Sequence, residues 1–258
     1  MPSSKIQRLL AGRFIIFKLL FIRLYCLFHR RDKRIREYKN KHKGERCFLI
    51  ATGPSLSLSD VEKLDGKVTF SLNSIVNLFD KTKWRPTYYM IADDNVYKKL
   101  KKSINELEDS TVFWGDFFIK HFERDGINIK MNLVTPMLMG AKSKIWRKEL
   151  YKRKFSDRAD KYIYYGFSTV YLILQLIAYM GFSEVVLLGA DCNYENGKEY
   201  SEITKYDNIN HPKDISNKLI WDYEVAKDYF DKNMIKVYNA TRGGILELFE
   251  RKELEELL

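Results

Sequence analysis

Short apolar segments alternate with helix-like stretches along the chain from residue 46 onward. The apolar segments have the length and the β-branched or aromatic content of buried strands. Strands that alternate with helices predict an α/β domain with a mostly parallel sheet. The segments that we expect to be strands are Cys47–Ala51, Lys67–Leu72, Thr87–Ala92, Thr111–Trp114, Ile129–Val134, Val185–Leu188 and Ile235–Asn239.

Helical patterns occupy much of the second half of the chain. Two long helices are predicted, at Ser168–Met180 and Ile215–Lys232, and Gly181 is expected to end the first. The acidic C-terminal segment Leu246–Leu258 has the pattern of an amphipathic helix. The segment Ala141–Tyr164, rich in lysine, arginine and tyrosine, is expected to be an insertion or a loop-rich cover.

A glycine turn follows the first predicted strand, in the sequence Thr52-Gly53-Pro54-Ser55. Glycine lets the backbone approach a ligand, proline fixes the exit of the chain, and Ser55 or Ser57 can cap the helix that follows. This is the form of a nucleotide-binding first turn. The chain has neither GxGxxG nor GxxxxGK[ST], so a purely structural turn fits equally well.

Polar residues also follow other predicted strands, and in a parallel sheet these ends meet at the edge where ligands bind. The amide of Asn73 can bond a base or a ribose, or it can form a turn. Ser168 or Thr169 begins a buried helix whose free N–H groups face the same edge, which makes an anion site. Gly189 and Asp191 belong to the strand end GADCNY.

Two adjacent carboxylates, Asp93 and Asp94, follow the strand TYYMIA. Hard cations prefer carboxylate oxygens, so a divalent metal can bind here in nucleotide chemistry. A helix N-cap at Asp94 accounts for the same residues equally well.

The polar segment 195–212 is long for a loop in a compact domain, which is typical of a lid or of disorder. It contains His211, whose ordinary pKa near neutrality suits a general base. The pair His211-Pro212 fits a cap or a turn before the helix at Ile215 at least as well.

The 258 residues, 45% of them hydrophobic, are enough for one substantial core. The formal net charge is +11, and the basic residues are dense between Lys5 and Arg46. This distribution favours a membrane surface over nucleic acid as the partner, although a basic solvated face is an alternative. We therefore expect a basic arm at 1–45 and a catalytic domain at 46–258.

The apolar stretch Leu9–Phe28 is interrupted by Arg13, Lys18 and Arg23. A cation near the centre of a spanning helix costs about 2.5 to 3.5 kcal/mol, so we expect an amphipathic helix that lies on the membrane through residues 5–38. Packing on another subunit is the alternative. A cleaved signal peptide is not expected, because no small-residue cleavage site follows.

Three cysteines, Cys26, Cys47 and Cys192, form no CxxC pair, and their odd number argues against a disulfide framework. A reducing cytosol fits this count. With the basic arm, it leads us to expect a cytoplasmic protein that is peripheral on the inner face of the cell membrane.

Taken in order, these motifs resemble bacterial sialyltransferases that act on lipo-oligosaccharide, of the Campylobacter type. The shared order is GPSL, a strand-end Asn, a Ser that starts a buried helix, a strand ending G-x-D, Tyr-x-Asn-Gly-x-x-Tyr and a His, within about Cys47 to Leu257. The resemblance implies a Rossmann-like sheet flanked by helices, a GT-A-like variant, with a lid at about 195–212. It also implies a symmetric homo-oligomer and an inverting transfer of a sialic-acid-like or other acidic sugar from a CMP-activated donor, with no cofactor or metal required.

The same resemblance implies roles for particular residues. The lid histidine is the base, two tyrosines hold the departing phosphate, and the glycine turn with the neighbouring strand ends binds the donor. Carried onto this sequence, the catalytic residues are His211, Tyr194 and Tyr200, and the donor-binding residues are Thr52, Gly53, Pro54, Ser55, Asn73, Ser168, Gly189 and Asp191.

Three departures separate the chain from that family. Thr52 replaces an asparagine in the turn, Tyr165 stands where an arginine precedes the helix-start serine, and one extra residue separates Asp191 from Tyr194. These changes leave the identity of the sugar open among sialic acid, Kdo and other CMP-linked acidic sugars.

Two other functions fit part of the pattern. The GPSL turn, the Ser-start helix and the G-x-D strand end are also similar to archaeal hydroxymethylpterin diphosphokinase-like (MptE-like) domains, which transfer diphosphate from ATP with magnesium. Under that alternative Asp93, Asp94 and Asp191 bind the metal. A non-catalytic, membrane-bound module that binds nucleotide sugars is a third class.

Overall fold

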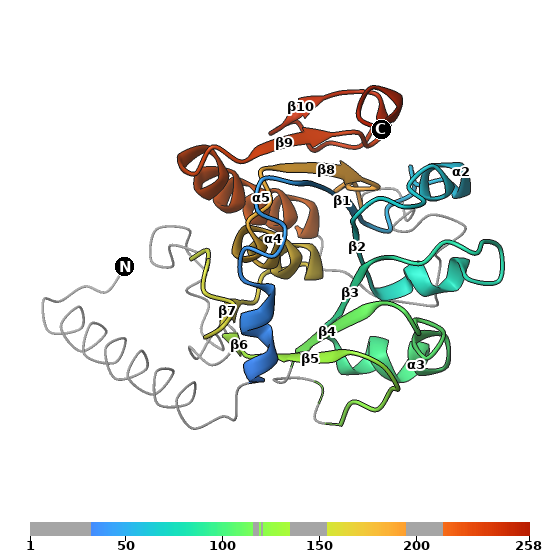
Figure 1. The fold of residues 1–258 in the computed structure, drawn as a ribbon. Coiled ribbons are helices and arrows are strands. Elements are labelled where there is room, and N and C mark those ends of the chain that lie inside the picture. The colour runs from blue at the N-terminus through green and yellow to red at the C-terminus, as the bar shows by residue number, and fades with distance from the viewer. Residues whose placement is uncertain (1–31, 116–118, 120, 135–153, 195–213) are drawn as a thin grey trace, which may run out of the picture.

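An eight-stranded parallel sheet forms the centre of the molecule (Figure 1). The structure is a computed structural model that describes residues 32–115, 119, 121–134, 154–194 and 214–258. The strand order is β10-β9-β8-β1-β2-β3-β4-β5, and every neighbouring pair is parallel, so the predicted α/β class is confirmed. The strands are β1 (Arg46–Ile50), β2 (Thr69–Leu72), β3 (Tyr88–Ile91), β4 (Thr111–Gly115), β5 (Asn128–Met131), β8 (Glu184–Leu188), β9 (Lys236–Asn239) and β10 (Glu250–Arg251).

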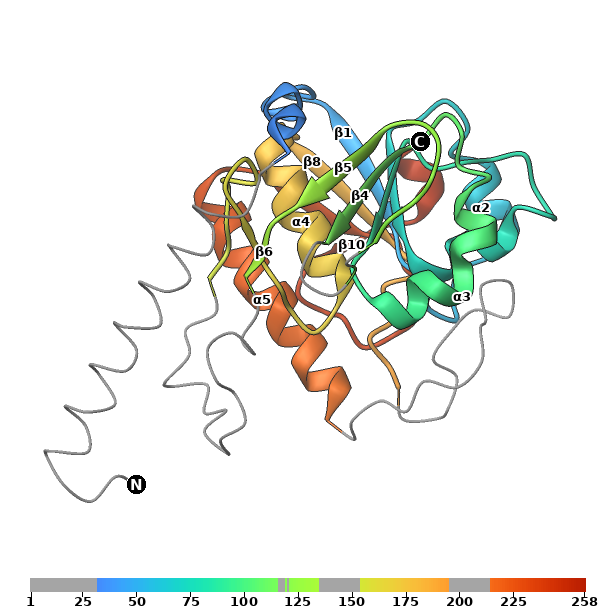
Figure 2. The same ribbon diagram turned by 90° about the horizontal axis from the view of Figure 1, so that it is seen from below.

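Helices cover both faces of this sheet. One face carries α4, α5 and the short 3-10 helix η1, and the other carries α2, η2 and α3, as the two views in Figures 1 and 2 show. The helices are η1 (Lys33–Tyr38), α2 (Leu58–Glu62), η2 (Asn73–Leu78), α3 (Asp94–Ile104), α4 (Thr169–Met180), α5 (Ile215–Lys232) and η4 (Leu254–Glu256).

Strand β1 shows why the sheet needs both layers. Its side chains alternate across the sheet, so Cys47 and Leu49 pack under α4 while Phe48 and Ile50 pack against the α2 and α3 layer. All four are buried. A continuous apolar run of this kind is typical of a central parallel strand, which explains why the sequence pattern predicted it correctly.

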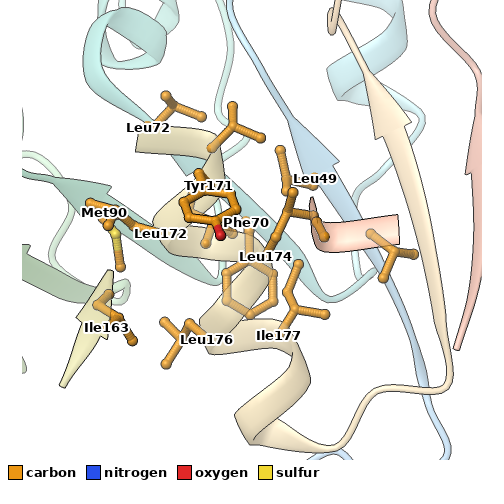
Figure 3. Packing of buried hydrophobic residues seen from close by; sticks show 14 of the residues in the cluster. Leu49, Phe70, Leu72, Met90, Ile163, Tyr171, Leu172, Leu174, Leu176 and Ile177 are labelled. Atoms are coloured by element: carbon orange, nitrogen blue, oxygen red, sulfur yellow. The ribbon is translucent and has the colours of Figure 1, made fainter. Parts of the chain in front are cut away.

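Helix α4 is buried on almost every side. Leu172, Leu174 and Ile177 pack among strand residues that include Leu49 and Phe70 (Figure 3). Ser168 caps its start by accepting a hydrogen bond from the Val170 N–H, and Gly181, with φ +84°, ends it as predicted. A helix that is apolar all round belongs in a core.

One buried polar side chain on α4, Gln175, joins this helix to a small second sheet of β6 (Leu133–Val134) and β7 (Ile163–Tyr164). Its Oε1 accepts from the N–H groups of Ser156 and Tyr164, at 3.1 and 2.9 Å. Its Nε2 donates to the carbonyls of Tyr164 and Tyr171, at 2.8 and 2.9 Å. The residue is fully buried with its amide satisfied by backbone groups.

The prediction of a single strand at Ile129–Val134 is wrong. The structure divides it at Asn132 into β5, which belongs to the large sheet, and β6, which pairs with β7. The Asn132 side chain donates to the Lys161 carbonyl at 3.2 Å and so turns toward the small sheet. Of the expected cover at 141–164, residues 141–153 lie outside the described residues.

The prediction of an amphipathic helix at Leu246–Leu258 is also wrong, because this segment contains the short strand β10 and the short 3-10 helix η4. Its apolar residues have helical spacing but serve two different cores. Leu246 and Phe249 pack in the cluster of α4 and α5, whereas Leu254 and Leu257 pack in the cluster on the opposite face of the sheet. One straight helix cannot face both sides of the sheet edge.

The edge strand β5 is partly occupied by residues at the start of η1. The Asp32 carboxylate accepts from the Lys130 N–H at 3.3 Å, and Arg34 donates to the Asn128 carbonyl at 2.6 Å. Asp32 and Arg34 also pair with each other, at 2.7 Å. Two charged side chains therefore take hydrogen bonds that a further strand would use.

The described part of the basic segment, 32–45, packs on the domain. Ile35 and Tyr38 are buried in the core, and the Asn40 N–H donates to the Tyr179 carbonyl in the last turn of α4 at 3.2 Å. The predicted arm helix 9–28 and Cys26 lie outside the described residues, while Cys47 and Cys192 are free thiols. Among the helices that are described, none is long and apolar enough to cross a bilayer.

Candidate functional site

A cavity opens at the carboxyl ends of β1, β2, β3 and β8, beside the first turn of α4. The chain runs from β1 toward β5 on one side of the sheet and returns through β8 on the other side of β1. Ligands of open α/β sheets bind at such a switch in strand order. The predicted site residues that line the cavity are Thr52, Gly53, Pro54, Asn73, Ser168, Gly189, Asp191 and Tyr194.

The glycine turn is fitted tightly against the end of β8. The Gly53 N–H donates to the Gly189 carbonyl at 2.9 Å. A Cβ atom on Gly53 would overlap both the Asp191 carboxylate and that carbonyl. Only glycine lets the ends of β1 and β8 approach this closely. Close packing alone is therefore enough to require glycine at this position, with or without a ligand.

Asp191 holds the turn from the side of β8. Its carboxylate accepts from the Ser55 hydroxyl at 2.8 Å and from the Ser55 N–H at 3.2 Å. Burial raises the pKa of Asp191, and the two bonds from Ser55 oppose that rise. Ser55 therefore binds Asp191 behind the turn, and the cavity is lined by Gly53 and Pro54 instead.

Asn73 sits at the end of β2 with a left-handed backbone, φ +47°. The buried hydroxyl of Tyr89 donates to the Asn73 carbonyl at 2.7 Å and supports this conformation. Within the described part of the chain, the buried Asn73 Oδ1 has no hydrogen-bond partner. Asn73 thus forms the turn at the end of β2 and lines the cavity, while its Oδ1 is buried without a partner among the described residues.

The start of α4 is fixed by a residue that the sequence reading missed. Asp222 is a buried carboxylate on α5, and it accepts from the Phe167 N–H at 2.6 Å, one residue before the Ser168 cap. Gly166 is needed here because a Cβ would lie 2.5 Å from Asp222. The signal in the sequence is an acidic residue on the apolar face of a helix.

Tyrosines form much of the remaining wall. Tyr194 lines the cavity with its N–H donating to the Ser216 hydroxyl at 3.3 Å, whereas Tyr200 and His211 lie outside the described residues. Tyr165 and Tyr223 also line the cavity, and sequence reasoning did not assign them to it. Burial, with a smaller effect of Asp93, raises the pKa of Tyr165 to about 12, so its phenol stays protonated.

The model of the family described as "6-hydroxymethylpterin diphosphokinase MptE-like" matches residues 24–197, more than half of the chain. The chain belongs to the MptE-like family. No curated protein matches its sequence.

Two solved structures are similar to this MptE-like chain. The MAf glycosyltransferase from Magnetospirillum magneticum AMB-1 has a TM-score of 0.55 and 13% identity, covering 88% of this chain. The MptE-like chain spans only 38% of that protein, and the likeness shows a shared fold. The sialyltransferase CstII from Campylobacter jejuni, solved with the substrate analogue cytidine-5′-monophosphate, has a TM-score of 0.46 and 14% identity, covering 81% of this chain and 85% of its own.

The three carboxylates considered for magnesium each bind other groups in this MptE-like chain. Asp191 accepts from Ser55, as described above. Asp93 caps α3 by accepting from the N–H groups of Asn95 and Val96, so the cap lies one residue before the expected Asp94. Asp94 pairs with Lys98 at 2.5 Å and does not line the cavity. Across the described ranges, no three His, Cys, Asp or Glu side chains form a group that fits a metal ion.

Proposed function

We propose that this protein is an inverting glycosyltransferase that moves a sialic-acid-like or other acidic sugar from a CMP-activated donor to a lipid-linked or surface oligosaccharide. The observation that carries the proposal is the convergence of Gly53, Asn73 and the start of α4 on one cavity at the strand-order switch. Backbone N–H groups at a helix start favour a bound phosphate, and a glycine turn lets its backbone come close to one.

The described lining of the cavity offers a phosphate hydrogen-bond donors and no cationic side chain. The charged side chains that the described residues bring to its lining are the carboxylates Asp93 and Asp191. The N–H groups at the start of α4 and the phenol of Tyr194 can stabilise a single phosphodiester without a cation. A triphosphate carries more charge and would need more compensation than these groups offer.

The proposed mechanism is a direct displacement at the anomeric carbon. His211 accepts the proton of the acceptor hydroxyl, whose oxygen bonds to the anomeric carbon from the side opposite the phosphate. The bond from that carbon to the phosphate oxygen breaks and CMP departs, with Tyr194 and Tyr200 donating hydrogen bonds to its phosphate. His211→Ala should therefore keep CMP affinity and lose transfer, whereas full transfer by this variant would rule out the base assignment.

The decisive experiment incubates the protein with several CMP-sugars and measures CMP release with and without a lipid-linked oligosaccharide. Acceptor-dependent release supports the proposal, and the donor that gives it identifies the sugar. The same assay with EDTA tests whether the transfer is independent of metal. Release from none of the donors, with no stabilisation by CMP, would overturn it.

A magnesium-dependent diphosphokinase that uses ATP is the second candidate, because the family match is to MptE-like proteins. The carboxylates assigned to magnesium do not form a group that fits a metal ion in the described part of the chain. A thermal-shift panel separates the candidates. Stabilisation by CMP alone favours the glycosyltransferase, and stabilisation by ATP with magnesium favours the kinase.

The proposed acceptor places the enzyme at a membrane. We propose that the basic arm holds the protein on the inner face of the cell membrane through residues 5–38, as a peripheral cytoplasmic enzyme and a homo-oligomer. The exposed cations Lys33, Arg36 and Lys39 continue the basic pattern onto the folded domain. Clusters of this kind are attracted to anionic lipid surfaces.

A further inference from the structure

A turn that the proposed function does not use follows β9, in the sequence Thr241-Arg242-Gly243-Gly244. It lies against the carboxyl end of β8. The Thr241 hydroxyl accepts from the Ala190 N–H at 3.0 Å, and the Ile245 N–H donates to the Asp191 carbonyl at 2.8 Å. The turn therefore fixes the backbone on both sides of the residue whose carboxylate holds Ser55.

The turn also reaches the donor turn directly, through Arg242. The guanidinium donates to the Asp60 carboxylate at 2.9 Å and to the Ser57 hydroxyl at 3.2 Å, which together form the capping box of α2. It also donates to the Ser55 carbonyl at 3.3 Å. Ser55 is thus held by Asp191 on one side and by Arg242 on the other.

The two adjacent glycines in the turn share a backbone conformation but differ in the space around them. Both have left-handed backbones, with φ +72° at Gly243 and +73° at Gly244. A Cβ on Gly243 would meet no atom within 4 Å, whereas a Cβ on Gly244 would lie 2.6 Å from the Asp191 carbonyl oxygen and 2.7 Å from its Cα. Only Gly244 lets the turn approach Asp191.

We infer that Thr241, Arg242 and Gly244 are positioning residues that hold the donor turn at Gly53–Ser55 in its ligand-binding conformation. The inference rests on the proposed function in assigning a nucleotide to that turn. It adds that the C-terminal part of the chain, beyond the residues that the family model matches, sets the geometry of the site. Backbone groups fixed before binding lose little freedom when the ligand arrives, and this raises affinity.

The test compares Gly244→Ala with Gly243→Ala in the full chain. Gly243 and Gly244 both have left-handed backbones, so an alanine at either position is strained by a similar amount. This strain alone should lower the melting temperature equally in the two variants. Only Gly244→Ala should displace Asp191. We expect it to weaken CMP binding, measured by calorimetry, by about tenfold or more, while Gly243→Ala binds as the wild type does.

Hydrogen exchange provides a readout that needs no ligand. The Ser55 N–H is bonded to Asp191, so peptides that cover residues 52–57 should exchange about tenfold faster in Gly244→Ala than in the wild type or in Gly243→Ala. Equal exchange in both glycine variants would overturn the inference. If the wild type shows no CMP binding, the proposed donor is wrong, and the exchange result still decides whether the turn is positioned in this way.

Arg242→Gln is the second variant, in case Gly244→Ala does not fold. The Arg242 side chain is half exposed, so the substitution leaves no buried void. We expect it to weaken CMP binding several-fold and to speed exchange at 52–57, with Arg242→Lys giving a partial effect. Wild-type affinity and exchange in Arg242→Gln would mean that Arg242 only stabilises α2.

Discussion

At the scale of single residues, the site depends on a few close approaches that sequence motifs alone do not define. Gly53, Ser55 and Asp191 were all assigned to the donor, yet only their place at the strand ends is visible in the sequence. The structure shows that Asp191 binds Ser55 and leaves Gly53 no room for a side chain. The contact joins residues 136 positions apart, which is why no local pattern could reveal it.

Gly53→Ala tests this close packing. The added Cβ must push apart the ends of β1 and β8, so we expect a loss of about 1–3 kcal/mol in the free energy of unfolding and at least a tenfold loss of CMP affinity. Gly66→Ala is the control for a general loss of stability. Its φ of +72° strains an added side chain, but no atom lies within 4 Å of the added Cβ. Denaturant unfolding and calorimetry measure the two effects, and unchanged CMP affinity in Gly53→Ala would contradict the role of the turn.

Tyr89→Phe tests the support of Asn73. Removing the hydroxyl takes one hydrogen bond from the Asn73 carbonyl, so stability should fall by about 0.5–1.5 kcal/mol and CMP affinity should fall with it. Tyr97→Phe is a control outside the cavity lining, since the Tyr97 hydroxyl donates to the Glu123 carbonyl at 3.3 Å and accepts from the Glu123 N–H at 3.0 Å. It should cost stability but not affinity, and equal affinity losses in both variants would argue against a specific role for Tyr89.

The pair of Asp60 and Arg242 should show itself in the pH dependence of stability. Burial favours the neutral acid, but hydrogen bonds from Arg242 and Ser57 outweigh it and lower the pKa of Asp60. The unfolded state then binds the proton more readily, so the contribution is complete above the ordinary Asp pKa of about 3.9 and is lost as the pH falls through the lower folded value.

Urea unfolding of the wild type and Arg242→Gln between pH 7 and pH 3 measures this contribution. The difference in stability between them should be constant above about pH 5 and should shrink below about pH 4. A difference that grows on acidification would show that Asp60 is not stabilised as an anion.

At the scale of elements, α4 organises the molecule, and the sequence shows it most clearly. Its apolar run, its serine cap and its terminal glycine all predicted the helix correctly, as continuous apolar runs predicted the central strands. The C-terminal segment failed because Leu246 and Leu254 have helical spacing but pack on opposite faces of the sheet. Periodicity reports that a residue is buried and not which core it enters.

Gln175→Met tests how α4 holds the small sheet. The change keeps the volume but leaves four hydrogen bonds to backbone groups of Ser156, Tyr164 and Tyr171 unmade, so we expect a loss of about 2–4 kcal/mol. Exchange of peptides that cover 156–164 should accelerate by a larger factor than exchange of the β4 peptides, which accelerates only through the loss of global stability. A uniform increase across both regions would place the effect in the whole core.

At the scale of the whole molecule, charge is divided between the site and the surface. The described lining of the cavity carries two carboxylates, while the chain as a whole has a net charge of +11 concentrated before residue 46. A positive long-range field attracts anionic surfaces in general, and the proposed membrane association rests on this attraction. The sequence revealed this division only in part, since the carboxylates at the cavity come from distant strands.

Vesicle binding tests the proposed membrane association. The full chain should sediment with vesicles that contain phosphatidylserine, and the binding should weaken markedly between 0.05 and about 0.5 M salt as charges are screened. Vesicles of phosphatidylcholine alone are the control. Equal binding to both lipids at high salt would show that apolar insertion dominates, and no binding to either would contradict the proposal.

The two edges of the large sheet determine whether copies of the protein can pair strand to strand. At one edge, Asp32 and Arg34 already occupy backbone groups of β5, and at the other, β10 is two residues long with the exposed charges of Glu250 and Arg251. Among the described residues, neither edge of the large sheet offers an uninterrupted strand for another chain to extend. At high local concentration, as on the proposed membrane surface, copies should therefore not pair strand to strand into a continuous intermolecular sheet, a route by which exposed strand edges lead to aggregation.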